Sequence, residues 1–96
     1  MKYNKAENVT DLLRQFLRSE GLETPLNEHR IISAWPEVVG HTVAVHTHKL
    51  EIHNQTLYAE IDTPVIRQEL MMRRSQLVEL LNQKAGARTI VDIHLI

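Results

Sequence analysis

Two adjacent arginines, Arg73 and Arg74, interrupt the apolar stripe of a stretch that otherwise has helical spacing. The stripe advances in steps of four, seven and four residues through Ile66, Leu70, Leu77 and Leu81. Arg67 lies one to two helical turns before the pair. Guanidinium groups bind phosphate and carboxylate oxygens through paired, charge-assisted hydrogen bonds. The three arginines are therefore a candidate contact for phosphate or for an acidic partner.

A packing interpretation of the same arginines stays open. Met71, Val78 and Leu80 widen the stripe, so one arginine could lay its aliphatic stem over the edge of the core and keep its charge in water. Packing is the favoured interpretation, because amphipathic helices commonly carry arginine at the margin of the apolar face. The C-terminal third is mildly basic, since residues 64–96 carry five basic against three acidic side chains. The candidate set for nucleic acid or a protein partner is Arg67, Arg73, Arg74, Lys84 and Arg88.

Six histidines are the other residues that could do chemistry, at positions His29, His41, His46, His48, His53 and His94. A zinc site needs three or four converging ligands. His46 and His48 could face the same way in an extended chain, but strand parity places His48 and His53 on opposite faces. No second close pair accompanies them. We therefore interpret the histidines as surface or partly buried side chains, and we expect no metal and no cofactor.

The sequence offers no motif of an enzyme. It has no cysteine, which excludes disulfides, zinc–thiolate sites and thiol nucleophiles. It has no phosphate-binding loop, dinucleotide fingerprint or Ser-His-Asp arrangement. Acid–base catalysis by Glu51, Glu60 or Asp62 would need a desolvating cleft, which a domain of 96 residues does not easily form. We expect neither catalysis nor a small-molecule substrate.

The composition is that of one ordinary globular domain. Hydrophobic residues make up 43% of the chain and charged residues 24%, and the net charge of −1 argues against general attraction to nucleic acid. The sequence has no apolar run of 18 residues and no signal-peptide pattern. We expect a cytoplasmic protein that does not bind membranes, with a flexible N-terminus over residues 1–7 and a single domain over residues 8–96.

The N-terminal half has the pattern of two or three helices. Asn8 is expected to cap a first helix that ends at Gly21 and whose apolar face is formed by Val9, Leu12, Leu13, Phe16 and Leu17. Thr24 is expected to cap a second helix, with Pro25 at its first position. Pro36 should kink that helix and leave a short helical segment over residues 36–45. Phe16 and Trp35 are expected in the core.

After these helices the apolar and polar residues alternate with period two, which predicts a β-hairpin turning at Asn54 and Gln55, with the turn type open. Its register pairs Ile52 with Leu57 and Leu50 with Ala59 on the core face, and Lys49 with Glu60 and Glu51 with Tyr58 on the outer face. Tyr58 alone would project from that outer face, so an aromatic platform for single-stranded nucleic acid is not expected.

The remaining sequence predicts one long helix and a closing strand. Thr63 and Pro64 have the types of a helix cap followed by a first helical residue, and the helix is expected to end near Gly86. Residues 90–96 form the strand, with Val91, Ile93 and Leu95 on one face. The fold class is therefore α+β, with a three-stranded sheet and helices packed on one of its faces.

With these elements placed, the chain resembles the DciA-type family of bacterial proteins. The resemblance rests on the amphipathic first helix and on a set of short motifs in a fixed order: Ile32-x-x-Trp35-x-x-Val38-Val39-Gly40, His46-Thr47, Leu50-x-Ile52, Leu57-x-Ala59-x-Ile61, Glu69-Leu70 and Leu80-Leu81-Asn82. The order and spacing of the set are more specific than any single motif. The matching residues run over nearly the full length of the chain.

The resemblance implies a K-homology-like domain and a non-enzymatic role in chromosome replication. Proteins of this family assist the loading of the replicative DNA helicase and bind DNA. The chain has no Gly-x-x-Gly motif, so any DNA contact would rely on basic side chains. The alternative is a protein–protein interaction module that touches no nucleic acid and uses the outer face of the hairpin or the edge of the closing strand.

Overall fold

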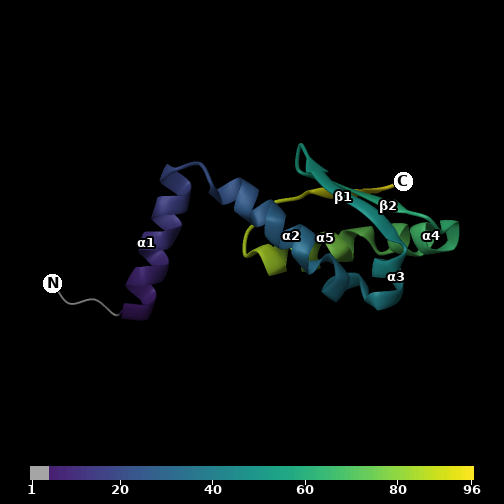
Figure 1. The fold of residues 1–96 in the computed structure, drawn as a ribbon, viewed down its shortest axis with the longest axis horizontal. Coiled ribbons are helices and arrows are strands. Elements are labelled where there is room, and N and C mark those ends of the chain that lie inside the picture. The colour runs from purple at the N-terminus through teal and green to yellow at the C-terminus, as the bar shows by residue number, and fades with distance from the viewer. Residues whose placement is uncertain (1–4) are drawn as a thin grey trace.

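A computed structural model describes residues 5–96, with the side chains from Val9 onward (Figure 1). Helices and strands follow one another as α1 (Lys5–Ser19), α2 (Glu23–Val39), α3 (His41–Val45), β1 (Thr47–His53), β2 (Thr56–Ile61), α4 (Pro64–Met72), α5 (Arg74–Ala85) and β3 (Asp92–Leu95). The predicted α+β class is confirmed. The flexible segment expected over residues 1–7 lies outside the described residues at positions 1–4, whereas residues 5–7 belong to α1.

The three strands form one mixed sheet in the order β1-β2-β3. Strands β1 and β2 are antiparallel in the predicted register, with Ile52 opposite Leu57 and Glu51 opposite Tyr58. Strand β3 runs parallel to β2. Asn54 and Gln55 have φ angles of 50° and 62°, so both central residues of the turn are left-handed. The twist of such a type I′ turn matches that of the two strands, which is why a glutamine is held in this conformation.

Helices α2 and α5 pack side by side against one face of the sheet and enclose the core between them (Figure 1). Trp35 of α2 is 1% exposed, as expected from the sequence. Its indole Nε1 donates a hydrogen bond to Thr47 Oγ1 at 3.1 Å, and the Thr47 hydroxyl donates to the carbonyl of Val43 at 2.8 Å. The tryptophan therefore fixes α2 to the start of β1 as well as filling the core.

The second helix runs through Pro36 and ends at Gly40, so the expected boundary at the proline is wrong. Gly40 has a φ of 91°, and its N–H donates to the carbonyl of Pro36 at 2.9 Å. A positive φ ends a helix more decisively than one missing hydrogen-bond donor. At the other end Leu22, not Thr24, precedes the helix, and Pro25 lies in its first turn, where the backbone N–H has no intrahelical acceptor to lose.

Helix α1 stands apart from the rest of the molecule (Figure 1). It begins at Lys5, so Asn8 lies inside the helix and is not its cap. The expectation that Phe16 belongs to the core is also wrong, because 54% of it is exposed and most of the apolar face of α1 is open to solvent. The turn at Gly21 directs the helix away from the sheet, and the molecule extends over 58 Å by 23 Å by 20 Å.

The expected long helix is two helices. The backbone leaves helical geometry at Arg73, where φ is −104° and ψ is 12°, and α5 starts at Arg74. Thr63 precedes α4 and Pro64 is at its start, as predicted.

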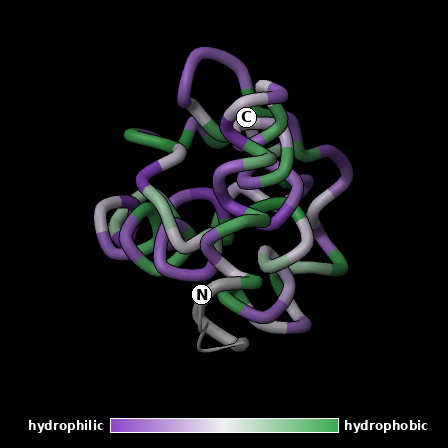
Figure 2. Tube along the Cα trace, turned by 90° about the vertical axis from the view of Figure 1, so that its left-hand side faces the viewer, coloured by the Kyte–Doolittle hydropathy of each residue, from purple (hydrophilic) through white to green (hydrophobic). Residues whose placement is uncertain are grey.

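In the closing strand Ile93 and Leu95 are buried, but Val91 is 51% exposed because the strand begins only at Asp92. Figure 2 shows hydrophobic and hydrophilic residues interleaved along the chain, as expected for elements with one buried side.

Candidate functional site

The arginines that interrupt the apolar stripe lie where α4 gives way to α5. The N–H of Arg73 donates to the carbonyl of Leu70 at 3.0 Å, and its carbonyl accepts from the N–H of Leu77 at 2.9 Å. Its side chain is half-buried, as in the packing interpretation. Arg74 is exposed and places Nε 3.2 Å from Oδ1 of Asp92, at the start of β3. The pair therefore marks a helix junction, and one of its two charges is already matched by a carboxylate.

Arg67 is occupied by the backbone of the sheet. Its Nη1 donates to the carbonyl of Ile61 at 2.5 Å, at the end of β2, and the side chain is half-buried. A hydrogen bond from a charged donor to a backbone carbonyl contributes about 1.5–3 kcal/mol. This arginine therefore holds α4 to the strand that precedes it, and its guanidinium has less freedom to bind a phosphate.

The two remaining cations lie at the other end of α5. Lys84 Nζ is 2.7 Å from Oε1 of Glu37, which joins α5 to α2. Arg88 follows α5 and is exposed, and no ion pair or side-chain hydrogen bond of Arg88 exists within residues 9–96. It lines an open depression together with Val78 and Asn82. Among the five basic residues of the set, Arg88 is thus the one that is both exposed and without a partner among the described residues, although the helical pattern did not single it out.

The structure does not gather the five basic residues into one patch. Arg73 precedes and Arg88 follows a helix of 12 residues, whose length at 1.5 Å per residue is about 18 Å. Between them, Arg74 and Lys84 are paired with acidic side chains. In the part of the chain that the structure describes, Arg67, Arg73 and Arg88 have no carboxylate partner, and of these Arg67 is bound to the carbonyl of Ile61.

A second cluster, which the sequence did not predict, joins the two histidines before and within β1 to the residue after β2. Oδ1 of Asp62 lies 2.8 Å from His46 Nδ1, and Oδ2 lies 2.6 Å from His48 Nε2. The Thr63 hydroxyl donates to Oδ1 at 2.7 Å. Hydrogen bonds from His48, Thr63 and His46 hold the pKa of the Asp62 carboxyl well below its usual range. The Asp62 carboxylate thus connects the start of the hairpin, at His46 and His48, to its end.

The signal for this cluster was in the hairpin register. Extending the predicted pairing of Lys49 with Glu60 by two residues places Asp62 opposite Thr47, between His46 and His48. The pairing shifts between Thr47 and Lys49, which prevents a simple parity argument from locating the contact. Two of the histidines thus share one carboxylate, and within residues 5–96 no group of three or more histidine, aspartate or glutamate side chains has the arrangement of a metal site.

The fold defines the class of the protein, which is a small α+β domain with a three-stranded mixed sheet. The family model described as Dna[CI] antecedent, DciA, matches residues 8–95, and the chain belongs to the DciA family. The family resemblance seen in the sequence is thereby confirmed. Membership implies an accessory role in DNA replication of the helicase-loader type, in a family that is non-enzymatic.

The comparison with curated proteins and the comparison with solved structures each gave no match. Among the described residues, no helix is long and apolar enough to cross a bilayer. The likeness to the K-homology fold stays a prediction.

Proposed function

We propose that this protein contacts the replicative DNA helicase as a non-enzymatic accessory factor, in the cytoplasm where the chromosome is replicated. The observation that carries the proposal is the match of the DciA family model to residues 8–95, which is nearly the full chain. The exposed groups described above supply ion-pairing and hydrogen-bonding side chains for a protein contact. A partner of this kind would be recognised by surface complementarity, without chemistry on a substrate.

We further propose that DNA binds weakly through the basic set, with unequal contributions. Arg73 and Arg88 have no carboxylate partner among the described residues, and they flank α5, whose length of about 18 Å corresponds to about five phosphates at 3.4 Å per nucleotide. Arg74 and Lys84 would have to exchange Asp92 and Glu37 for phosphate. Arg67 would contribute only indirectly, by stabilising the fold, because its guanidinium is bound to the carbonyl of Ile61.

The helicase contact is tested by immobilising this protein and passing the replicative helicase of the same organism over it. We expect specific retention that persists without DNA. Resin carrying an unrelated domain of similar size and net charge is the control. Failure to retain the helicase at low ionic strength would contradict the central proposal.

DNA contact is tested by measuring affinity as a function of salt for the double variant with Arg73→Ala and Arg88→Ala. We expect weaker binding to all sequences alike and a log–log salt slope that is shallower by about two, since each lost phosphate contact contributes about 0.9. The matched control carries Arg14→Ala and Arg18→Ala on α1, which removes the same charge elsewhere. Equal losses in the two double variants would show that only net charge matters, against a site.

A protein-interaction module without nucleic-acid binding is the second candidate. It is favoured by the net charge of −1 and by the ion pairs that already neutralise Arg74 and Lys84. A gel-shift series with single-stranded and duplex DNA at low salt separates the candidates. Retention of the helicase together with no shift of either DNA would select this second function.

A further inference from the structure

The face of the sheet that points away from the helices carries three aromatic rings in a row, one from each strand. His53 of β1, Tyr58 of β2 and His94 of β3 contribute them. The ring of Tyr58 lies between the two imidazoles, with centroids 6.0 Å from His53 and 5.5 Å from His94. The expectation that Tyr58 would stand alone on this face is therefore wrong, because β3 pairs His94 directly with Tyr58.

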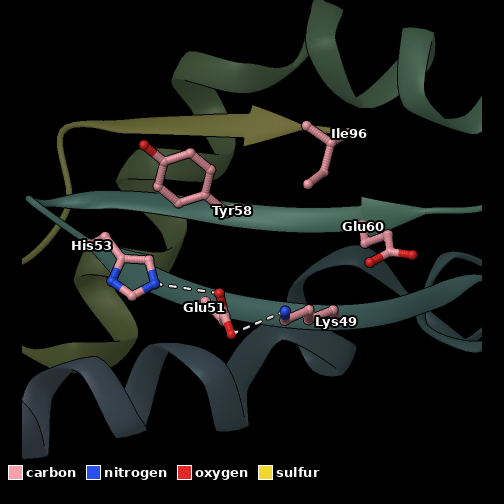
Figure 3. Close-up of a pocket in the computed structure, with 6 residues that line it drawn as sticks. All are labelled: Lys49, Glu51, His53, Tyr58, Glu60 and Ile96. Atoms are coloured by element: carbon pink, nitrogen blue, oxygen red, sulfur yellow. Dashed lines mark hydrogen bonds and ion pairs between the residues drawn. The ribbon is translucent and has the colours of Figure 1, made fainter.

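A shallow pocket of about 250 Å³ opens on this face beside the rings, and its walls are Lys49, Glu51, His53, Tyr58, Glu60 and Ile96 (Figure 3). In the figure the ring of Tyr58 is seen flat, with one face turned outward. Strands β1 and β2 and the residue after β3 line the pocket, and the helices lie behind the sheet. No element among residues 5–96 covers it.

The two carboxylates of the pocket, Glu51 and Glu60, differ in their neighbouring side chains. Glu51 is held from both sides, by His53 Nε2 at 3.3 Å and Lys49 Nζ at 3.3 Å, and these two partners keep the pKa of its carboxyl below the ordinary value. Glu60 is exposed and has no ion pair with any side chain from Val9 to Ile96. It lies two residues after Tyr58 on β2, so the two side chains leave the same face about 7 Å apart.

The charge of the face indicates which partner fits. Lys49 is the one lysine or arginine of the pocket, against Glu51 and Glu60, and it already pairs with Glu51, so the Glu60 carboxylate is left without a cation. Rings on a sheet could also stack nucleic-acid bases, but such platforms combine aromatic side chains with a positively charged groove for the backbone. Here the phosphates would meet carboxylates. The carboxylates and the exposed face of the Tyr58 ring therefore favour a partner that presents a cation.

We propose that the outer sheet face binds an arginine-bearing segment of a protein partner. The guanidinium stacks on the open face of Tyr58 and donates hydrogen bonds to the Glu60 carboxylate, while Ile96 contacts the aliphatic stem. A planar guanidinium can lie flat on a ring while the N–H groups at its edge donate hydrogen bonds, whereas an ammonium group has no flat face to stack. The inference does not depend on the proposed helicase and DNA contacts, since it uses the opposite side of the domain from the basic set's helices.

The test is an NMR titration of the full chain with a hexa-arginine peptide, with hexa-lysine and hexa-glutamate as comparison probes. We expect hexa-arginine to shift the resonances of Tyr58, Glu60 and His94 at lower concentrations than hexa-lysine does. Hexa-glutamate should leave them unchanged. Hexa-arginine shifts spread evenly over the acidic residues of α2 and α5 would overturn the proposal.

Two variants and one control locate the contact. Glu60→Gln and Tyr58→Leu should each weaken hexa-arginine binding by about two- to fivefold, whereas Tyr58→Phe keeps the ring and should bind like the unaltered chain. Glu79→Gln removes an equivalent exposed carboxylate from α5 and should have no effect. Circular dichroism checks that each variant is folded. If Tyr58→Leu unfolds, the difference in hexa-arginine affinity between Glu60→Gln and Glu79→Gln still tests the proposal.

The competing occupant is single-stranded nucleic acid, and a parallel titration with oligo-thymidine tests it. We expect no shifts at His53, Tyr58 and His94. If oligo-thymidine shifts these three residues, and Glu60→Gln strengthens rather than weakens its binding, the face is a base-stacking platform and the proposal of an arginine-bearing partner is wrong.

Discussion

His48 Nε2 lies 2.6 Å from Oδ2 of Asp62, and this contact connects the first part of β1 to the residue that follows β2. His46 completes the arrangement from the other carboxylate oxygen. The same three residues connect α3, the hairpin and the start of α4, because Asp62 also donates its N–H to the carbonyl of His46 at 3.1 Å. A single exposed carboxylate thus joins elements on either side of the hairpin.

Asp62→Asn should lower stability at neutral pH and lose that effect in acid. The pKa of Asp62 is lowered in the folded state, so the carboxylate contributes stability that is present above its unfolded pKa of about 3.9 and is lost as pH falls through the depressed folded value. Because the side chain is 40% exposed, solvent screens the contact and the loss should be small. Urea unfolding of both chains from pH 7 to pH 2 measures it.

The control for this prediction is Glu79→Asn, which removes an exposed carboxylate from α5. Its effect on the unfolding midpoint should not follow the same pH profile. A constant difference between Asp62→Asn and the unaltered chain from pH 7 to pH 2 would show that the carboxylate acts through packing and not through its charge.

Asn82→Ala should destabilise the domain by about 2–3 kcal/mol. Oδ1 of Asn82 accepts from the N–H groups of Thr89 and Ile90 at 2.9 and 3.0 Å, and Nδ2 donates to the carbonyl of Ile90 at 2.8 Å. Thr89 and Ile90 are buried, so these backbone groups would lose their partners without gaining water. Chemical denaturation measures the loss.

The neighbouring Gln83→Ala is the matched control for Asn82. Gln83 is exposed on the same helix, and its replacement should change the unfolding free energy by no more than about 0.5 kcal/mol. Similar losses for the two amides would contradict the role assigned to Asn82, because alanine is the better helix former and a loss cannot come from helix propensity.

Gln55→Gly should stabilise the protein by about 0.5–1 kcal/mol. A left-handed conformation costs a residue with a Cβ about 1–2 kcal/mol, and the flexibility of glycine in the unfolded chain offsets part of the gain. Gln55 has a φ of 62°, and its carbonyl still accepts from Val91 after the change. Thermal unfolding checks this, and Asn54→Gly should gain less because asparagine tolerates the conformation.

Two aromatic truncations should differ sharply. Trp35→Ala should cost about 3–5 kcal/mol, because the side chain is buried and bonded to Thr47. Phe16→Ala should cost about 0.5 kcal/mol or less, because the ring is largely exposed on α1. A large loss for Phe16→Ala in denaturant unfolding would place α1 against the rest of the fold in solution, contrary to the structure.

The hairpin is the part of the fold that the sequence predicted best. Alternation of apolar and polar residues determines both the faces and the register, since a slip by one residue would expose Leu57 and Ala59. The turn residues were less informative, because the strands impose a left-handed φ on Gln55 against its own preference. Strong pairing on both sides overrides the local preference of one residue.

Helix boundaries were predicted less well, and for a different reason. Pro36 and Thr24 are strong local signals, yet the helix passes through the first and begins before the second. Burial of Ile31 and Trp35 against the sheet favours one continuous helix by more than a missing hydrogen bond costs. The break at Arg73 followed no proline or glycine, although the arginines interrupted the apolar stripe at that point.

The sequence by itself determined the fold class, the pairing of β1 with β2, the buried place of Trp35 and membership of the DciA family, because periodicity and motif order are properties of neighbouring residues. Only the tertiary structure decided which charges are free. Arg74 meets Asp92 and Lys84 meets Glu37 across long stretches of chain, and Arg67 meets the backbone carbonyl of Ile61 across the turn between β2 and α4. The row formed by His53, Tyr58 and His94 likewise exists because the parallel strand β3 brings a distant residue beside the hairpin. Contacts of this kind depend on how elements pack, which the spacing of residues along the chain does not encode.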